Sequence, residues 1–290
     1  MKKQFTVVNQ HGRFIIAPHP RFGFWQVRPQ PSRAFLERYY RLSYRNPTYS
    51  FHEELYVHLL RQHCPDLFRR RVRALEIGCG RGNFLLGLKH AGLETYGFEP
   101  GAGDHRACGA KGLSVWNSPF DLRRARQHAP YGLISLVGVL EHFPQPVAML
   151  TQVSSLLAAN GVLFVLVPND FNPFQEAFVA KSGQHRWFLG PPEHLNYFTP
   201  STLQRLLVGC GFSVIHRTTR FPIDMFLLMG HNYIAHPRLG KPVHLERVEF
   251  EKSFLGGRED VLWRFYDALA QADLGREIIC ICRRSRTERS

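Results

Sequence analysis

Short apolar runs alternate with segments of helical periodicity over most of the chain. The apolar runs predict strands at residues 72–77, 95–98, 113–116, 133–138, 162–167, 212–216 and 277–282. The helical segments lie at 83–91, 104–110, 146–157, 201–209 and 260–270. The run Val162–Val167 consists of Val, Leu and Phe, as in strands that are covered on both faces. The alternation predicts an α/β fold with a doubly wound, mostly parallel, seven-stranded sheet.

Residues 1–71 differ in character from the rest of the chain. They contain 13 basic and 4 acidic side chains and are rich in Pro and aromatic residues. Four prolines interrupt the first 32 residues, so we expect loops there with a short hairpin. Helices are expected from about Ser32 and over residues 50–63, before Pro65. We therefore expect a basic, aromatic-rich N-terminal extension at 1–71 and a main domain at 72–290, with long insertions at about 168–200 and 219–259.

Composition excludes several protein classes. The 290 residues are 44% hydrophobic and 21% charged, which argues against a disordered chain or a small disulfide scaffold. The longest apolar stretch, near Leu133–Leu140, is too short to cross a bilayer. No apolar segment follows the first lysines, and the six cysteines form no CxxC pair. We expect a cytoplasmic protein with reduced thiols and without a membrane span.

The chain carries a formal net charge of +14. A basic surface attracts anions such as phosphorylated small molecules, nucleic acid or anionic lipid. A solvated basic surface with no dedicated ligand explains the same charge. The net charge alone therefore does not identify a binding partner.

Glycines mark the end of the first expected strand. Residues 75–83 read Leu-Glu-Ile-Gly-Cys-Gly-Arg-Gly-Asn and lead from the strand into the next helix. Glycine lets the backbone turn sharply and approach a ligand closely, and the following helix offers unpaired N–H groups. In an open α/β sheet, this strand end is where a nucleotide-like ligand binds. A dinucleotide fingerprint has the spacing G-x-G-x-x-G, whereas this turn has G-x-G-x-G, which argues against an NAD-dependent enzyme.

The form E-x-G-x-G-x-G, from Glu76 to Gly82, resembles the first motif of class I S-adenosylmethionine-dependent methyltransferases. The segment Tyr96–Pro100 places Glu99 where that family holds the ribose hydroxyls of the cofactor. Residues 134–142 and 161–169 are similar to the family's fourth and fifth strands. The segment His194–Pro200 resembles a signature of its small-molecule branch. The resemblance covers residues 72–217 and implies the Rossmann-like fold of that family.

The resemblance implies a site for S-adenosylmethionine, with S-adenosylhomocysteine as the product. Glu76 is expected near the ammonium of the methionine portion, and Glu99 at the ribose. An acid at the end of the third strand, which contacts adenine in the family, is missing here, so Asn117 and Ser118 are expected to serve instead. The full set of expected cofactor residues is Glu76, Gly78, Gly80, Gly82, Phe98, Glu99, Pro100, Asn117, Ser118 and Val139.

Two histidines are candidate catalytic groups. Methyl transfer is an in-line displacement in which the enzyme mainly supplies proximity, but a hydroxyl acceptor must lose a proton, for which histidine is suited. His142 follows the fourth strand and His194 lies in the downstream signature. Glu193 and Tyr197 are expected to contact the acceptor, although the segment His194-Leu195-Asn196-Tyr197 would serve equally as a loop staple. No metal-ligand spacing is evident, so no metal is expected.

The leading hypothesis is a methyltransferase that acts on a small, anionic acceptor at an oxygen atom, with the N-terminal extension as a lid over the acceptor. A nucleic acid acceptor is the alternative that the charge favours, but the sequence lacks an RNA-binding appendage and an Asn-Pro-Pro-Tyr motif. A protein that binds S-adenosylmethionine without turnover is a third reading. Fold alone does not choose among these acceptors.

Overall fold

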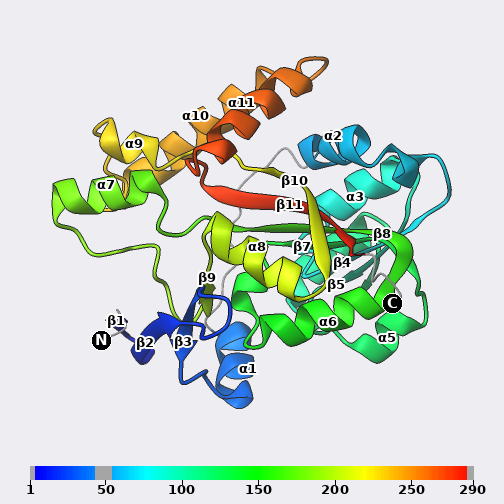
Figure 1. The fold of residues 1–290 in the computed structure, drawn as a ribbon, viewed down its shortest axis with the longest axis horizontal. Helices are drawn as coiled ribbons and strands as arrows, with labels where there is room; N and C mark the ends of the chain where they lie inside the picture. Colours follow the sequence, from blue (N-terminus) through cyan, green and yellow to red (C-terminus); the bar gives the residue numbers. More distant parts are fainter. Residues whose placement is uncertain (1–3, 43–53, 286–290) are drawn as a thin grey trace.

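A seven-stranded sheet forms the centre of the computed structural model, which describes residues 4–42 and 54–285 (Figure 1). Its strand order is β10–β11–β8–β7–β4–β5–β6. The strands are β4 (Arg73–Ile77), β5 (Glu94–Phe98), β6 (Ser114–Trp116), β7 (Tyr131–Val137), β8 (Leu157–Pro168), β10 (Phe212–Thr218) and β11 (Glu277–Arg284). Among these seven strands, β11 alone runs in the direction opposite to the other six. The predicted mostly parallel, doubly wound sheet is confirmed.

Alternate side chains of the central strands enter two separate cores. In β8, one core receives Leu163, Val165 and Val167, and the other receives Val162, Phe164 and Leu166. The same division continues in β11, because side chains of consecutive strand residues point to opposite faces. Burying each such side chain contributes roughly 1.5–3 kcal/mol. The unbroken apolar runs of the sequence therefore correspond to strands that are covered on both sides.

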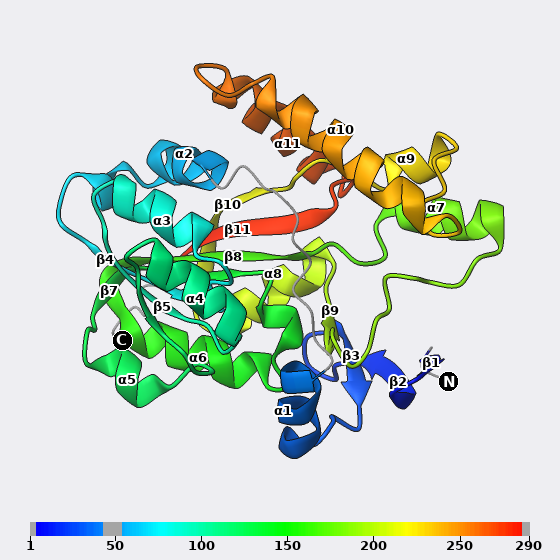
Figure 2. The same ribbon diagram turned by 180° about the vertical axis from the view of Figure 1, so that it is seen from behind.

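Helices cover both faces of the sheet (Figure 2). The core on one face is completed by α5 (Leu122–Arg126), α6 (Pro146–Leu156) and α8 (Pro200–Gly209). The core on the other face is completed by α2 (Glu54–His63), α3 (Asn83–His90) and α11 (Glu259–Gln271). A further helix, α4 (Ala102–Ala110), contacts β6 at the edge. No helix in the described part of the chain combines the length and apolarity that crossing a membrane requires.

A second, four-stranded sheet contains the N-terminal segment. Its order is β1 (Phe5–Asn9), β2 (Gly12–Pro18), β3 (Trp25–Arg28) and β9 (Asn196–Tyr197). The expected hairpin is β1–β2, but the expectation of loops over the rest of the first 32 residues is wrong, because β3 continues the sheet. The partner of β3 is β9, about 170 residues later, and a pairing at that distance leaves no local signal.

The structure divides residues 1–71 into two parts. The first part holds β1 to β3 and α1 (Arg33–Leu42), which begins where the sequence predicts. In the second part, α2 packs into the core of the main sheet. Residues 50–53 of the expected second helix lie outside the described residues. The boundary at 71/72 and the lid remain predictions.

The two long insertions contain secondary structure of their own. Residues 168–200 include α7 (Pro173–Ser182) and β9, and residues 219–259 include α9 (Met225–Leu228), a 3-10 turn (Pro237–Leu239) and α10 (Gly240–Lys252). Helices α7 and α9 contact each other. Figure 1 shows both insertions at the end of the molecule where β8 ends and β11 begins.

Candidate active site

The glycine turn joins β4 to α3 in a conformation that favours glycine at three positions. Gly78, Gly80 and Gly82 have φ angles of 70°, 51° and 72°, all in the left-handed region. A Cβ atom at Gly78 would lie 2.7 Å from Cγ2 of Val139, and one at Gly82 would lie 2.6 Å from Cδ1 of Leu113. Larger residues are therefore excluded both by backbone strain and by the neighbouring side chains.

The carboxylate of Glu99 connects the end of β5 to this turn. Its Oε2 accepts a hydrogen bond from Gly80 N at 2.8 Å, and its Oε1 accepts one from Gly101 N at 2.6 Å. Burial raises the pKa of the Glu99 carboxyl, and the two backbone N–H groups oppose that effect. Each carboxylate oxygen has a second lone pair, so the group can accept further hydrogen bonds from a diol. The carboxylate thus lies directly beside the turn, as the resemblance implies.

The other expected cofactor residues on β4 and β5 differ in exposure. Glu76 lies within β4 and is only 3% exposed. Phe98 is fully buried, and its ring stacks on Trp116 at a centroid distance of 4.5 Å. Pro100 is exposed. Phe98 therefore supports this edge of the sheet from the core, whereas Pro100 faces solvent.

Asn117, Ser118 and Val139 lie around the same strand ends. The Asn117 side-chain amide donates to the backbone carbonyl of Glu99 at 3.0 Å and so holds the loop that follows β5. Ser118 Oγ is buried and has no hydrogen-bond partner among the residues that the structure describes. Val139 follows β7 and packs against Gly78. The structure thus brings the predicted cofactor residues to one edge of the sheet, and their individual roles remain predictions.

Two distant motifs meet at the end of β7 and form a histidine cluster. Glu141 and His142 lie in a 3-10 turn, η2 (Leu140–His142), and His194 lies in the loop before β9. The rings of His142 and His194 are 5.0 Å apart, edge to face. Leu195 N donates to the carbonyl of Glu141 at 2.9 Å, which ties the two segments together.

The two histidines differ in their hydrogen bonds. Nδ1 of His142 lies 2.6 Å from the carbonyl oxygen of Glu193. Because a carbonyl only accepts, Nδ1 of His142 is the donor. Neither ring nitrogen of His194 forms a hydrogen bond with a residue that the structure describes. Each neutral ring keeps one nitrogen that can accept a proton, and His194 is the member of the pair for which no hydrogen bond to the described residues competes with a ligand.

Burial sets the protonation of the cluster. It lowers the pKa of His142, and it lowers the pKa of His194 well below its usual value, with further contributions from the neighbouring His142 ring and from the positive charge of Arg276. Burial also raises the pKa of Glu141 to about 8. Both rings are therefore neutral near pH 7, and a neutral imidazole is the form that accepts a proton.

Asn196 is a site residue that the sequence analysis did not single out. Its amide nitrogen donates to the carbonyl of Phe143 at 2.7 Å and to that of Leu140 at 3.3 Å, and its Oδ1 accepts from Gln26 Nε2 at 2.8 Å. It therefore connects η2 with β3 and β9. Its place in the segment His-Leu-Asn-Tyr was the signal available in the sequence.

Tyr197 and Glu193 support the same loop. The Tyr197 hydroxyl donates to the carbonyl of His194 at 2.9 Å, and its ring is buried. Glu193 contributes its backbone carbonyl to His142, and burial raises the pKa of its carboxyl. These contacts match the loop-staple alternative, and the expected acceptor contacts of both residues remain predictions.

Glu141, His142 and His194 are also metal-ligand types. One ligand atom from each lies within 4.8 Å of the others. The donor set suits a transition metal, because neutral imidazole and carboxylate are its usual ligands. The sequence expectation of no metal therefore needs a direct test.

Comparison with known sequences identifies the class. The sequence profile of a family described as "Methyltransferase domain" matches residues 49–217, more than half of the chain. The chain belongs to this family, and the predicted class I S-adenosylmethionine-dependent methyltransferase is confirmed, as is the prediction of an enzyme.

The curated proteins that match part of this chain share a name. A ubiquinone biosynthesis O-methyltransferase of Marinobacter nauticus is 26% identical over 187 residues, which cover 57% of this chain and 76% of the relative. The protein of the same name from Psychrobacter arcticus is 23% identical over 152 residues, which cover 49% of this chain and 59% of the relative. The chain thus spans less than two thirds of the second relative.

Solved structures share the fold. The plantazolicin methyltransferase BamL, in complex with S-adenosylhomocysteine, is 13% identical with a TM-score of 0.51, covering 88% of this chain and 92% of the other. Magnesium protoporphyrin IX methyltransferase from Synechocystis PCC 6803 is 14% identical with a TM-score of 0.50, covering 88% of this chain and all of the other. At these identities the likeness shows the fold alone.

Proposed function

We propose that the chain binds S-adenosylmethionine at the glycine turn and transfers its methyl group to a hydroxyl oxygen of a small, anionic acceptor. One observation carries this proposal: the Glu99 carboxylate lies 2.8 Å from Gly80 N, so the sugar-binding acid and the turn form one site. Glu76 and Val139 complete its walls toward β4 and β7. S-adenosylmethionine supplies an electrophilic methyl group on a sulfonium, whose leaving group is neutral.

The residues of the chain then have two tasks. The turn and the strand ends hold the reactants in line, which is the main source of rate in a displacement of this kind. His194, as a neutral imidazole, takes the proton of the acceptor hydroxyl as the oxygen becomes a nucleophile. His142, held by the Glu193 carbonyl, positions the ring of His194.

Oxygen is the proposed atom for two reasons. The curated relatives are named O-methyltransferases, and His194 provides a base, which a hydroxyl acceptor needs. The anionic character of the acceptor is proposed from the formal net charge of +14. A cytoplasmic location fits such a substrate and remains a prediction.

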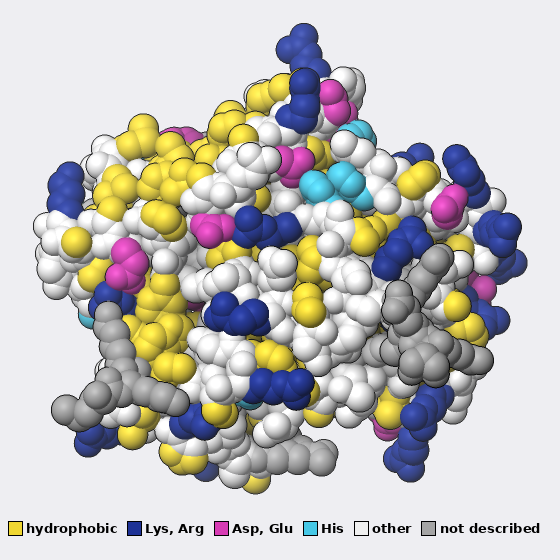
Figure 3. All heavy atoms as spheres, viewed as in Figure 1, with side chains coloured by type: hydrophobic (Ala, Val, Ile, Leu, Met, Phe, Trp, Pro, Cys, Tyr) yellow, Lys and Arg dark blue, Asp and Glu magenta, His cyan; other side chains and the backbone are white. Residues whose placement is uncertain are grey.

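Nucleic acid is the less favoured acceptor. On the face drawn in Figure 3, Lys and Arg side chains are scattered rather than gathered in one stripe. A protein surface that binds nucleic acid along its phosphate backbone needs clustered basic residues. The remaining alternative is a protein that binds S-adenosylmethionine without transferring its methyl group. A transfer assay with labelled S-adenosylmethionine distinguishes this alternative from an enzyme.

Calorimetric titration with S-adenosylhomocysteine tests the donor site. We expect wild-type chain to bind it, and Glu99→Ala to weaken binding at least tenfold. Glu94→Gln changes an acid at the start of the same strand and should bind normally. Labelled S-adenosylmethionine, incubated with separate RNA and metabolite pools, should then label the metabolites. Absence of binding by well-folded wild-type protein would overturn the proposal, and binding without transfer to any pool would favour the non-catalytic reading.

A further inference from the structure

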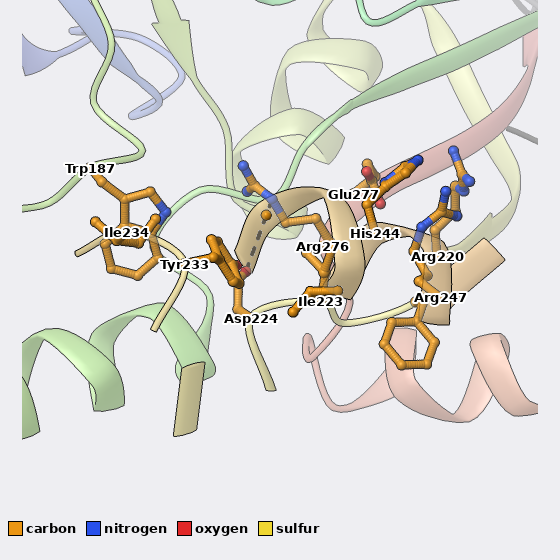
Figure 4. Close-up of a pocket in the computed structure, with 13 residues that line it drawn as sticks. Trp187, Arg220, Ile223, Asp224, Tyr233, Ile234, His244, Arg247, Arg276 and Glu277 are labelled. Atoms are coloured by element: carbon orange, nitrogen blue, oxygen red, sulfur yellow. Dashed lines mark hydrogen bonds and ion pairs between the residues drawn. The ribbon is translucent and has the colours of Figure 1, made fainter. Parts of the chain in front are cut away.

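A cavity of about 310 Å³ lies between the second insertion and the start of β11 (Figure 4). Its walls include Trp187 from the loop after α7, Tyr233 and Ile234 from the loop after α9, His244 from α10, and Arg276. This volume is at the lower end of the range for small-molecule sites. The sequence analysis assigned none of these five residues a role.

The cavity adjoins the histidine cluster through the end of β8. Glu277 of β11 pairs with Pro168 of β8, and Asn169 N donates to the Arg276 carbonyl at 2.8 Å. The Arg276 guanidinium lies close enough to His194 to help lower the pKa of that ring. Arg276 therefore stands at the junction between the cavity and the proposed base.

Arg276 has donor capacity that its neighbours leave unused. Its Nη1 lies 3.9 Å from Asp170 Oδ1, and its Nε lies 4.0 Å from Asp224 Oδ2, both beyond hydrogen-bond distance. Nη1 is buried and forms no hydrogen bond with any residue that the structure describes. The Arg276 side chain as a whole is 23% exposed and lines the cavity, so an oxyanion there can form charge-assisted hydrogen bonds with the exposed part of the guanidinium.

The other arginines of the cavity already form hydrogen bonds and ion pairs with protein side chains. Arg247 Nη1 lies 2.5 Å from Glu251 Oε2, and Arg220 Nη1 donates to the Tyr56 hydroxyl at 2.7 Å. Arg220 also pairs with Glu251 at 3.4 Å. These buried groups form one network, and its two arginines belong to the cavity lining. Arg276 is thus the arginine with a donor to offer.

One side of the cavity suits a flat apolar body, and the carboxyl groups of Asp224 and Glu277 also belong to the lining. Figure 4 shows Trp187, Tyr233 and Ile234 grouped on the opposite side of Arg276 from His244 and Arg247. The Tyr233 hydroxyl donates to Asp224 Oδ1 at 3.2 Å, so its polar end is held by the protein. An aromatic or similarly planar ligand gains contact area on such a wall.

We propose that this cavity binds the part of the acceptor remote from the methylated oxygen, and that Arg276 selects acceptors with a carboxylate or phosphate on a flat apolar body. The inference rests on the proposed function and adds the substrate class. Asp170 and Asp224 keep the guanidinium charged and oriented, and the oxyanion binds the part of the guanidinium that lines the cavity.

Three probes of similar shape test the inference: 2-naphthoate, 2-naphthyl phosphate and 2-naphthalenemethanol. Each is titrated calorimetrically into the full chain, with and without S-adenosylhomocysteine. We expect at least one oxyanion probe to bind ten or more times tighter than the neutral alcohol, and the two oxyanions distinguish carboxylate from phosphate. Arg276→Gln should abolish this preference, and Trp187→Ala should weaken all three probes.

Two controls keep the outcome clear. Arg284→Gln changes an exposed arginine at the far end of β11, the strand that follows Arg276, and should leave every affinity unchanged. Arg276→Lys keeps the charge and should retain part of the preference even if Arg276→Gln folds poorly. Equal binding of charged and neutral probes by wild-type chain, or an unchanged preference in folded Arg276→Gln, overturns the inference. Loss of S-adenosylhomocysteine binding by wild-type chain would instead overturn the proposed function.

Discussion

His142 and His194 are chemically identical side chains with different roles in the proposed reaction. His142 donates to a backbone carbonyl, whereas the ring nitrogens of His194 are open among the described residues. Burial lowers the pKa of His194 well below its usual value, so its ring is neutral and able to accept a proton throughout the neutral range.

We predict that His194→Ala lowers kcat by roughly 10²-fold with unchanged affinity for S-adenosylhomocysteine, because the loss removes proton transfer and spares the donor site. His142→Ala should have a smaller effect. Steady-state kinetics on both variants measures the difference. A larger loss for His142→Ala would assign the base to that residue instead.

Glu141 makes stability depend on pH. Its pKa is raised by burial to about 8 from the ordinary value of 4.5, so the folded state holds the proton more tightly than the unfolded state. The resulting stabilisation is complete below about pH 4.5 and is lost as pH rises through about 8. We predict that the free energy of unfolding of wild-type chain falls by roughly 2–4 kcal/mol more than that of Glu141→Gln between pH 5 and pH 9. Urea unfolding at the two pH values checks this, and parallel curves would contradict it.

At the scale of elements, β9 is the shortest strand of the described residues, and it joins segments that are distant in sequence. Asn196 in β9 bonds to η2 and to Gln26 of β3. The two insertions that flank the sheet end are likewise joined, through α7 and α9. The candidate active site therefore depends on pairings between segments that are distant in sequence.

We predict that Asn196→Ala lowers the free energy of unfolding by roughly 2–3 kcal/mol, because buried carbonyls such as that of Phe143 lose their donor. Asn160→Ala, at an exposed position in β8, serves as the matched control and should cost far less. Denaturant unfolding of the two variants compares them. Equal losses would show that the amide hydrogen bonds contribute little.

Elements with strong local patterns could be predicted from the sequence. The seven strands of the main sheet and the helices α3, α4, α6, α8 and α11 lie where the periodicity placed them, since each is an unbroken apolar or helical pattern. Helices α7 and α10 were missed because they lie inside segments assigned as loops. The strand β9 has two residues and exists through its partner, so no periodicity could show it.

In the candidate site too, residues of local motifs could be predicted from the sequence, and residues positioned by distant contacts could not. Residues in the glycine turn, Glu99 and the two histidines belong to local motifs and were found. Asn196 and Arg276 owe their positions to tertiary contacts, and a single sequence does not display such contacts. The roles assigned to the motif residues await the experiments above.

At the scale of the whole molecule, the excess positive charge distinguishes two acceptor classes. We predict that raising NaCl from 50 to 200 mM changes kcat/KM for a small acceptor less than tenfold, because few charges meet such a ligand. An RNA acceptor with 6–10 phosphate contacts would lose roughly 10³–10⁵ in affinity over that range. A steep salt slope in the methyl-transfer assay would revive the nucleic acid hypothesis.

The histidine cluster also makes metal content a property to measure. We predict that prolonged dialysis against EDTA leaves kcat unchanged, because the proposed reaction uses His194 as a free base. Elemental analysis of the purified chain accompanies the assay. The contradicting result is a stoichiometric content of zinc or another transition metal, together with activity that chelation removes and added metal restores. That result would show that the histidine cluster is a metal site and that His194 is not a free base.

The late position of β9 has a consequence for biosynthesis. The edge of β3 can pair with β9 only after Asn196 and Tyr197 have been synthesised and have left the ribosome. By then β4 and β5 are already available to pair with each other. Through that interval the nascent chain carries an unpaired β-edge on β3. The sheet that contains β1 to β3 is thus completed only after the segment that holds β9 has been made.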